Sequence, residues 1–286
     1  RCRDAGINFF DCADVYGGGR SETILGKLMA SARHELVITS KAFFPTGSSP
    51  LARGSNRHHL LHAVEQSLKR LNTDRIDVLY LHHYDQDTEL EDSLRSLELL
   101  VQQGKILYPA ASNFAAWQTM RALALSDKRG WTPFACIQPM YNLLKRQAEV
   151  ELLPMAAETG LGVCPYGPLA GGILTNKYAT EGTQGRLNDN ATYKLRYGEP
   201  HYQDTTARFA ALAAELGCHP ATLAVAWVAS HPAVTCPILG ARNVQQLEPA
   251  LKALELGLTP ELRARVSALT PPPAPANDRS EERKPS

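Results

Sequence analysis

The chain has 286 residues, of which 44% are hydrophobic, and its formal net charge at pH 7 is +1. This is enough apolar material for one large α/β domain or two smaller ones, and the balanced charge gives no reason to expect a nucleic-acid partner. The apolar runs are much shorter than the roughly 20 residues that span a bilayer, and the N-terminus shows no signal peptide. We therefore expect a cytoplasmic protein without membrane insertion, and its six scattered cysteines should be reduced thiols.

Short aliphatic or β-branched runs alternate with amphipathic segments along the chain. We expect strands at residues 7–10, 36–41, 76–82, 106–112, 135–139, 161–166 and 234–239. Helical patterns cover residues 57–71, 91–103, 147–159, 203–216 and 220–230, and Ser21 is expected to cap a helix after the first strand. This alternation predicts βαβ units in a parallel sheet, and the repeat of about 30–40 residues per unit fits a (β/α)₈ barrel.

The predicted barrel is one domain, because no linker interrupts the pattern before residue 270. Residues 271–286 are proline-rich and then charged, so we expect a disordered tail there. Residues 167–202 show no long helical or strand pattern and are expected to form an irregular lid. Since this segment follows a strand, it should lie at the C-terminal face of the barrel, where the active sites of such barrels are found.

Polar residues stand where the predicted strands end, and in a barrel these positions converge. They are Asp11, Lys41, His82, Ser112 with Asn113, Gln138 and Tyr166. Tyr16 follows five residues after Asp11. A tyrosine can protonate a carbonyl oxygen while hydride reaches its carbon, a lysine beside it favours the phenolate, and a carboxylate can hold that lysine. A histidine can donate a hydrogen bond to the substrate oxygen, and a cofactor must bring the hydride.

Seven segments resemble aldo-keto reductases, in the same order, over residues 6 to about 250. They are GINFFDCADVYGGGRSETILGK, VITSK, LYLHHYD, ASNFAAWQ, IQPMYNLLKRQ, PYGPLAGGILTNKY and ILGARNVQQLE. The resemblance is greatest to the branch that holds microbial reductases and potassium-channel β subunits. It implies a (β/α)₈ barrel that binds NADPH without a Rossmann fold.

The resemblance also implies roles for individual residues. The catalytic residues would be Asp11, Tyr16, Lys41 and His82, with Tyr16 as proton donor and Lys41 lowering its pKa. The residues implied to bind the cofactor are Ser112, Asn113 and Gln138 at the carboxamide, Tyr166 on the nicotinamide ring, Leu169, Gly171 and Lys177 at the pyrophosphate, and Gly240, Ala241, Arg242 and Gln246 at the adenosine 2′-phosphate and adenine. Because a guanidinium suits a phosphate, Arg242 favours NADPH over NADH.

The sequence departs from the family pattern at three places. Gly167 stands where many relatives have serine, and Ala250 stands where the family has an asparagine that contacts adenine. Residue 1 falls inside the expected first helix, so residues 1–270 are expected to be an N-terminally incomplete barrel, a fragment that lacks a hairpin and the first strand and keeps seven strands.

Two clusters suggest metal binding but have simpler explanations. His58 and His62 are spaced i,i+4, which can bind zinc, but a solvated helix face is the better interpretation. The acidic run at residues 85–92 could bind a cation, but it better fits a polar loop leading into a helix N-terminus. We therefore predict no metal site.

These observations favour an NADPH-dependent reductase of aldehydes or ketones, with a small carbonyl compound as its substrate. Two alternatives stay open: an NADPH-binding regulatory subunit of a channel-type partner, and an inactive truncated reductase. The identity of the carbonyl substrate and the oligomeric state are not predicted by the sequence.

Overall fold

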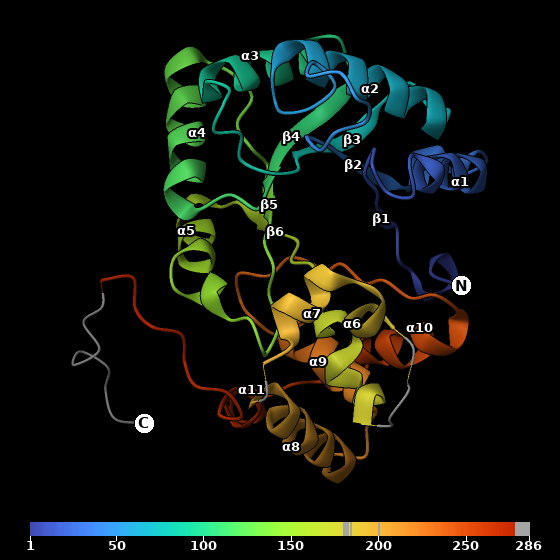
Figure 1. The fold of residues 1–286 in the computed structure, drawn as a ribbon, viewed down its shortest axis with the longest axis vertical. Helices are drawn as coiled ribbons and strands as arrows, with labels where there is room; N and C mark the ends of the chain where they lie inside the picture. Colours follow the sequence, from blue (N-terminus) through green and yellow to red (C-terminus); the bar gives the residue numbers. More distant parts are fainter. Residues whose placement is uncertain (180–182, 184, 200, 278–286) are drawn as a thin grey trace. The chain divides into compact units, whose positions relative to one another are not determined.

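The computed structural model describes residues 1–179, 183, 185–199 and 201–277, and it divides into two compact units. The first unit is Arg1–Gln138 and the second is Pro139–Ser286. Strands alternate with helices along the first unit, whereas helices follow one another along most of the second (Figure 1).

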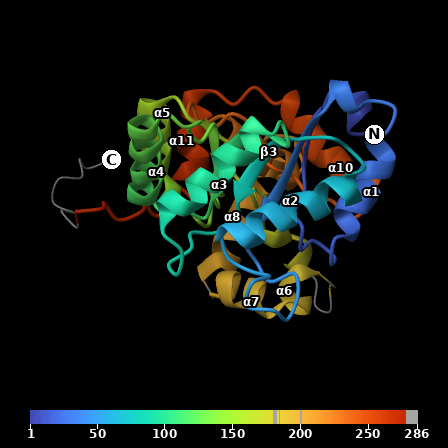
Figure 2. The same cartoon turned by 90° about the horizontal axis from the view of Figure 1, so that it is seen from above.

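The first unit is built on a parallel sheet whose strands follow one another in sequence order. The strands are β1 (Phe9–Asp11), β2 (Val37–Ala42), β3 (Ile76–Leu81), β4 (Ile106–Ser112) and β5 (Cys136–Gln138). Helices α1 (Arg20–Met29), α2 (Arg57–Leu71), α3 (Leu90–Gln102) and α4 (Ala116–Arg129) connect them, with 3-10 turns at η1 (Arg3–Ala5) and η2 (Arg33–Glu35). The four helices form an outer layer along the strands (Figures 1 and 2). The βαβ order predicted for this half is confirmed.

The strand register brings the predicted polar residues to the same edge of this sheet. Asp11 pairs with Thr39, and Lys41 pairs with Tyr80. Ser112 pairs with Gln138 on the far side of the sheet. In parallel strands the C-terminal ends lie together, so each of these side chains starts from the same rim.

Helices α1 and α2 pack closely because Gly26 lies at their contact. A Cβ on Gly26 would be 2.5 Å from the backbone oxygen of Leu71, so a larger residue would force the helices apart. On α2 the side chains of Leu60, Val64 and Leu71 are buried, as the helical pattern predicts.

The start of α1 differs from the prediction. The helix begins at Arg20, and its N-cap residue is Gly19 with φ 87°, so the predicted Ser21 cap is wrong. Ser21 lies inside the first turn, where its Oγ is 3.0 Å from the Cys12 Sγ. Three successive glycines with positive φ make the preceding turn, a conformation that residues with a Cβ rarely adopt.

The second unit is largely helical. Its elements are η3 (Gln147–Glu149), α5 (Leu152–Thr159), β6 (Gly162–Val163), η4 (Ala170–Thr175), η5 (Lys177–Ala179), α6 (Arg186–Asp189), α7 (Ala191–Tyr197), α8 (His201–Glu215), α9 (Pro220–Ala229), α10 (Val244–Leu251), η6 (Lys252–Leu254) and α11 (Pro260–Ser267). Trp227 of α9 is fully buried, stacks on Tyr141 at a ring separation of 5.1 Å, and has the Arg263 guanidinium 4.8 Å from its ring. This cluster anchors α9 and α11 in the unit's core.

Two predictions for the second unit need correction. Residues 167–202 are not irregular: where the structure describes them they form short helices, and residues 180–182, 184 and 200 lie outside the described residues. The segment predicted as a strand at 234–239 forms only an isolated parallel bridge, Tyr166↔Ile238, with Thr235 N and Ile238 N donating to Val163 O and Pro165 O. Among the described residues the chain therefore has six strands where seven were predicted.

The predicted tail lies mostly beyond the described part of the chain. Residues 271–277 have no helix or strand, and residues 278–286 are outside the described residues, so disorder there stays a prediction. No single helix in the described ranges is long and apolar enough to cross a membrane; one pair, α8 with α9, passes by length and composition but is bent by 96°.

Candidate active site

Lys41 is a buried cation whose ammonium is surrounded by oxygen acceptors. Its Nζ lies 2.5 Å from Asp11 Oδ2, 2.7 Å from the Cys12 carbonyl oxygen and 3.4 Å from Tyr16 Oη. The lysine is 1% exposed, and a charge at that depth is stable only with such partners. Three acceptors for three ammonium protons fix the side chain in one position.

The local fold explains how Tyr16 reaches Lys41. Strand β1 ends at Asp11, and the Tyr16 backbone N–H donates to Ala13 O in the turn that follows. The Tyr16 side chain is 39% exposed, and its hydroxyl is the end in contact with Lys41. The phenol therefore joins the buried ion pair to the solvent-facing side of the site.

Burial has the largest effect on the acidity of Tyr16. It raises the pKa of the phenol above its ordinary value of 10.0, and the Lys41 charge opposes this rise without cancelling it. In the resting site the Tyr16 pKa is therefore raised, because the lowering effect of Lys41 is smaller than the effect of burial. At neutral pH the phenol keeps its proton, which is the form a proton donor needs.

His82 follows β3 and lies beside Tyr16. Their ring centroids are 5.9 Å apart in an edge-on arrangement, and the Phe44 ring is 4.9 Å from His82 in a similar arrangement. Burial, followed by the Lys41 charge, lowers the pKa of His82 to about 4, so the imidazole is neutral near pH 7. Its Nδ1 has no hydrogen-bond partner among the described residues, whereas the neighbouring His83 is exposed.

The other oxygen of Asp11 is held by two neutral donors. Thr39 Oγ1 donates to Asp11 Oδ1 at 2.8 Å, and Gln138 Nε2 donates to the same atom at 2.9 Å. Both partners are buried. Asp11 is thus fixed from two strands, β2 and β5, in addition to its contact with Lys41.

Ser112 and Asn113 complete this rim. Ser112 Oγ donates to Gln138 O at 2.9 Å, and Asn113 Nδ2 donates to His82 O at 2.9 Å. Asn113 has a positive φ of 58°, which turns the chain at the end of β4. The structure therefore brings together all seven predicted site residues of the first unit; their roles stay predictions.

The second unit holds the remaining predicted cofactor residues in two segments. Tyr166 begins the first, which continues through Leu169 and Gly171 to Lys177 in the short helices η4 and η5. A Cβ on Gly171 would lie 2.7 Å from Tyr193 Cδ1, and one on Gly172 would lie 2.8 Å from Lys177 Cε, so the backbone approaches these side chains closely. Both glycines have positive φ.

The second segment, residues 240–246, leads into α10. Arg242 N donates to Gln246 Oε1 at 3.2 Å, and Asn243 caps the helix by accepting from Gln246 N at 2.9 Å. The Arg242 guanidinium lies 3.6 Å from Asp189 Oδ2, and both side chains are more than half exposed. Ala250, a departure from the family pattern, is buried in α10 and has no hydrogen-bonding side chain to offer a ligand.

These residues fit a cofactor that carries phosphates. Lys177 and Arg242 supply cations, and the capped N-terminus of α10 supplies a partial positive charge. Arg242 is only weakly engaged, because an exposed ion pair contributes little and a phosphate could replace the Asp189 carboxylate.

Sequence reasoning missed two residues of this site, Thr39 and Asp14. Asp14 is 3% exposed, and its carboxyl oxygens have no hydrogen-bond partner among the described residues. Burial, followed by the negative charge of Glu22, raises the pKa of Asp14 to about 7. Thr39 could have been inferred from its position two residues before Lys41, which puts both on the same sheet face, but no sequence signal marks Asp14.

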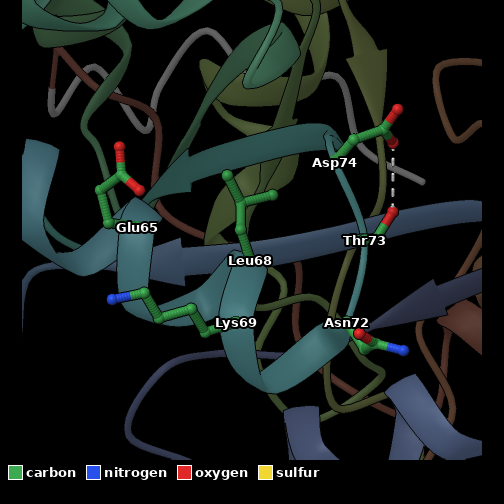
Figure 3. Close-up of a pocket in the computed structure, with 6 residues that line it drawn as sticks. All are labelled: Glu65, Leu68, Lys69, Asn72, Thr73 and Asp74. Carbon is green, nitrogen blue, oxygen red and sulfur yellow. Dashed lines mark hydrogen bonds between the residues drawn. The ribbon is translucent and has the colours of Figure 1, made fainter.

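The alternative sites gain no support. No group of three possible metal ligands occurs within the described ranges, and Asp85 of the acidic run accepts from the backbone N–H groups of Ser55 and Asp87, as a loop residue does. A shallow hollow at the C-terminal end of α2 is lined by Glu65, Leu68, Lys69, Asn72, Thr73 and Asp74 (Figure 3). It contains none of the residues described above, and Glu65 is already paired with Lys105.

Comparison with known proteins assigns the chain to a class. The fold is built on parallel βα units, and the model of the "Aldo/keto reductase family", a family of oxidoreductases, matches residues 1–270. The chain belongs to this family, whose members typically use a nicotinamide cofactor, and its predicted (β/α)₈ fold class is confirmed.

Three relatives illustrate the breadth of the family. An uncharacterized oxidoreductase of Bacillus subtilis is 36% identical over 284 residues, covering 94% of this chain and 85% of the relative. A probable voltage-gated potassium channel subunit beta of Oryza sativa is 36% identical, with 94% and 84% covered. A putative aryl-alcohol dehydrogenase of Schizosaccharomyces pombe is 37% identical, with 90% and 80% covered.

Proposed function

We propose that this protein reduces an aldehyde or ketone to an alcohol with NADPH. The observation that carries the proposal is the Lys41 ammonium, which contacts the Asp11 carboxylate and the Tyr16 hydroxyl at once. This arrangement suits transfer of a proton from Tyr16 to an oxygen that gains negative charge, because the nearby cation stabilises the phenolate left behind. NADPH, when bound, supplies the hydride.

His82 orients the substrate in this proposal. Its imidazole is neutral near pH 7 and so carries one N–H. A buried N–H group without an acceptor is rarer in proteins than a buried acceptor without a donor. Since Nδ1 of His82 is buried and has no partner among the described residues, we place the proton on Nε2 and leave Nδ1 unprotonated. The Nε2–H group would then donate to the carbonyl oxygen that Tyr16 protonates.

Arg242 is expected to select NADPH over NADH. Arg242→Ala should weaken NADPH binding by about tenfold or more, because a charge-assisted contact to the 2′-phosphate is lost, and should leave NADH binding nearly unchanged. Titrations that follow quenching of protein fluorescence by each cofactor measure both affinities. Lys252→Ala, which removes an exposed cation from η6, is the matched control. An equal loss of affinity for NADPH and NADH in Arg242→Ala would contradict the role of Arg242 at the 2′-phosphate.

The direct test of the function is turnover. The purified protein is mixed with NADPH and a panel of aldehydes and ketones, and NADPH consumption is followed together with alcohol formation. Stoichiometric formation of alcohol supports the proposal. Failure to reduce any member of a broad panel, by a protein that binds NADPH, would refute it.

A second function is favoured by three relatives whose names describe probable or putative voltage-gated potassium channel β subunits. The rice potassium channel β subunit matches this chain along 94% of its length, so a regulatory subunit that binds NADPH and contacts a channel-type partner is the alternative. Tight binding with very slow cofactor release and no steady-state turnover would favour this alternative. The small-molecule carbonyl substrate, the cytoplasmic location and the absence of nucleic-acid binding belong to the reductase proposal.

A further inference from the structure

Strand β2 uses its alternating side chains for two different networks. Thr39 and Lys41 point to the same face and both contact Asp11, whereas Ser40 points to the other face and donates to Glu22 of α1 at 2.5 Å. Thr39 is directly opposite Asp11 in the β1–β2 ladder and is fully buried. Its hydroxyl therefore has a fixed position from which to hold the carboxylate.

The Asp11 carboxylate needs such a support. It sits at the last residue of a three-residue strand, and rotation about its Cβ–Cγ bond would move Oδ2 away from Lys41. Two donors, Thr39 and Gln138, prevent this by binding Oδ1. The family resemblance assigns Gln138 to the nicotinamide carboxamide, and a Gln138 amide engaged there would leave Thr39 as the donor that holds Oδ1.

We propose that Thr39 is a positioning residue that holds Asp11 Oδ2 against Lys41 and thereby keeps Lys41 beside Tyr16. This inference rests on the proposed reductase function. Thr39→Val keeps the shape of the side chain and removes the hydroxyl, whereas Thr39→Ser keeps the hydroxyl. Comparison of the two variants separates the hydrogen bond from packing.

Thr39→Val is expected to lower kcat about tenfold, as loss of a hydrogen bond to a charged group does, and to leave the NADPH dissociation constant within about twofold. Thr39→Ser should restore kcat. The high-pH limb of the rate profile, which reports loss of the Tyr16 proton, should move upward in Thr39→Val because Lys41 is less firmly held near the phenol. An unchanged kcat in Thr39→Val, or equal defects in both variants, would overturn the inference.

A second readout does not depend on turnover. Ultraviolet difference titration of the cofactor-free protein against its Tyr16→Phe variant isolates ionisation of Tyr16, and the Thr39→Val change should raise its midpoint. A wild-type protein that turns over no carbonyl would refute the proposed function but leave this titration decisive for Thr39. If the Tyr16 titration midpoint is the same with Thr39 and with the Thr39→Val change, the positioning role of Thr39 is refuted, whether or not the protein reduces a carbonyl.

An independent feature of the second unit is a close pair of cysteines. Cys164 Sγ and Cys236 Sγ are 3.6 Å apart although 72 residues separate them in the sequence. Their segments run side by side, since Cys236 N donates to Val163 O and Ile238 N donates to Pro165 O. Cys164 is buried and Cys236 is partly exposed. These two segments also carry Tyr166 and Gly240.

We further infer that Cys164 and Cys236 form a site of peroxide modification that closes to a disulfide. The Cys236 thiolate attacks a hydroperoxide oxygen, which breaks the O–O bond and gives a sulfenic acid and an alcohol or water. The Cys164 sulfur then attacks the sulfenic sulfur, forming the S–S bond and releasing water. Two thiols are oxidised, one hydroperoxide is reduced, and the sulfurs need approach only from 3.6 Å to about 2.05 Å.

The test is peptide mapping after brief treatment of the whole protein with hydrogen peroxide and alkylation of remaining thiols. We expect one cross-linked species joining the peptides of Cys164 and Cys236, lighter by two hydrogens and cleaved by a dithiol reductant. It should vanish in Cys236→Ser and persist in Cys136→Ser, which removes a cysteine of the first unit. If both sulfurs are alkylated or singly oxidised, or cross-link to other cysteines, the inference is wrong.

Discussion

Replacing Tyr16 with phenylalanine is expected to lower kcat/KM for carbonyl reduction by a factor of about 10²–10⁴, the range in which general acid catalysis contributes. The variant loses only the hydroxyl that lies 3.4 Å from Lys41 Nζ. It keeps the ring that packs edge-on against His82. Steady-state assays with NADPH and an aldehyde that the wild-type protein reduces measure the effect.

A matched control tests whether the loss of activity comes from the missing Tyr16 hydroxyl proton. Tyr108→Phe removes another tyrosine hydroxyl from the first unit, at an exposed position of β4, and should leave turnover unchanged. NADPH affinity should be similar in the wild-type protein and both variants, because Tyr16 binds the carbonyl side of the site in our proposal. If the Tyr16→Phe variant turns over at the wild-type rate, Tyr16 is not the general acid and another group must donate the proton.

Much of the site in the first unit follows from the sequence for a simple physical reason. A parallel sheet places the ends of its strands at one rim, so polar residues at the ends of β1, β2 and β3 must converge, and the contact of Asp11 with Lys41 is the direct result. The short elements between 170 and 197 were missed because helices of three to seven residues are too short to show a helical period. The Ser21 cap failed because Gly19, with its positive φ, turns the chain one residue before α1 begins.

The balance of electrostatic effects could not be predicted in the same way. The sequence shows a lysine that favours the phenolate, but the pKa of Tyr16 depends on how deeply its hydroxyl is buried, and burial has the larger effect. Likewise, strand alternation puts Thr39 on the same face as Lys41, but only the strand register shows that Thr39 lies opposite Asp11. The contact of Ser40 with Glu22 on the other face is not marked in the sequence either. Such effects arise from three-dimensional neighbours, which periodicity does not specify.

Asp14 is expected to make the protein less stable as the pH rises from about 4 to about 7. Its carboxyl has a pKa of about 7 in the folded chain, against about 3.9 in an unfolded chain. Between these values the folded protein binds more protons than the unfolded one, so the free energy of unfolding falls with rising pH. Above the folded pKa, the whole loss of stability caused by the buried, ionised Asp14 carboxyl is present. Three pKa units correspond to a penalty on the order of 4 kcal/mol.

Asp14→Asn tests this linkage because asparagine has a similar size and does not ionise. The variant's free energy of unfolding minus that of the wild-type protein should grow by on the order of 2–3 kcal/mol between about pH 5 and about pH 8. Urea unfolding at both pH values measures the difference. Other titrating groups, such as His82, whose lowered pKa costs stability only as the pH falls, act alike in both proteins and cancel. A pH-independent difference would contradict the prediction.

Asp127→Asn, which makes the same change at an exposed position near the end of α4, is the control. The charges that face Asp14 are Glu22, which raises its pKa, and Arg70 and Lys41, which lower it. Glu22 is itself fully buried and held by Arg70 and Ser40. The backbone N–H of Val15 also lowers the Asp14 pKa, but burial has the larger effect. If Asp14→Asn stabilises the protein near pH 8, the ionised Asp14 carboxyl lowers the stability of the turn that leads to Tyr16. Residues that serve a functional site often have such a cost in stability.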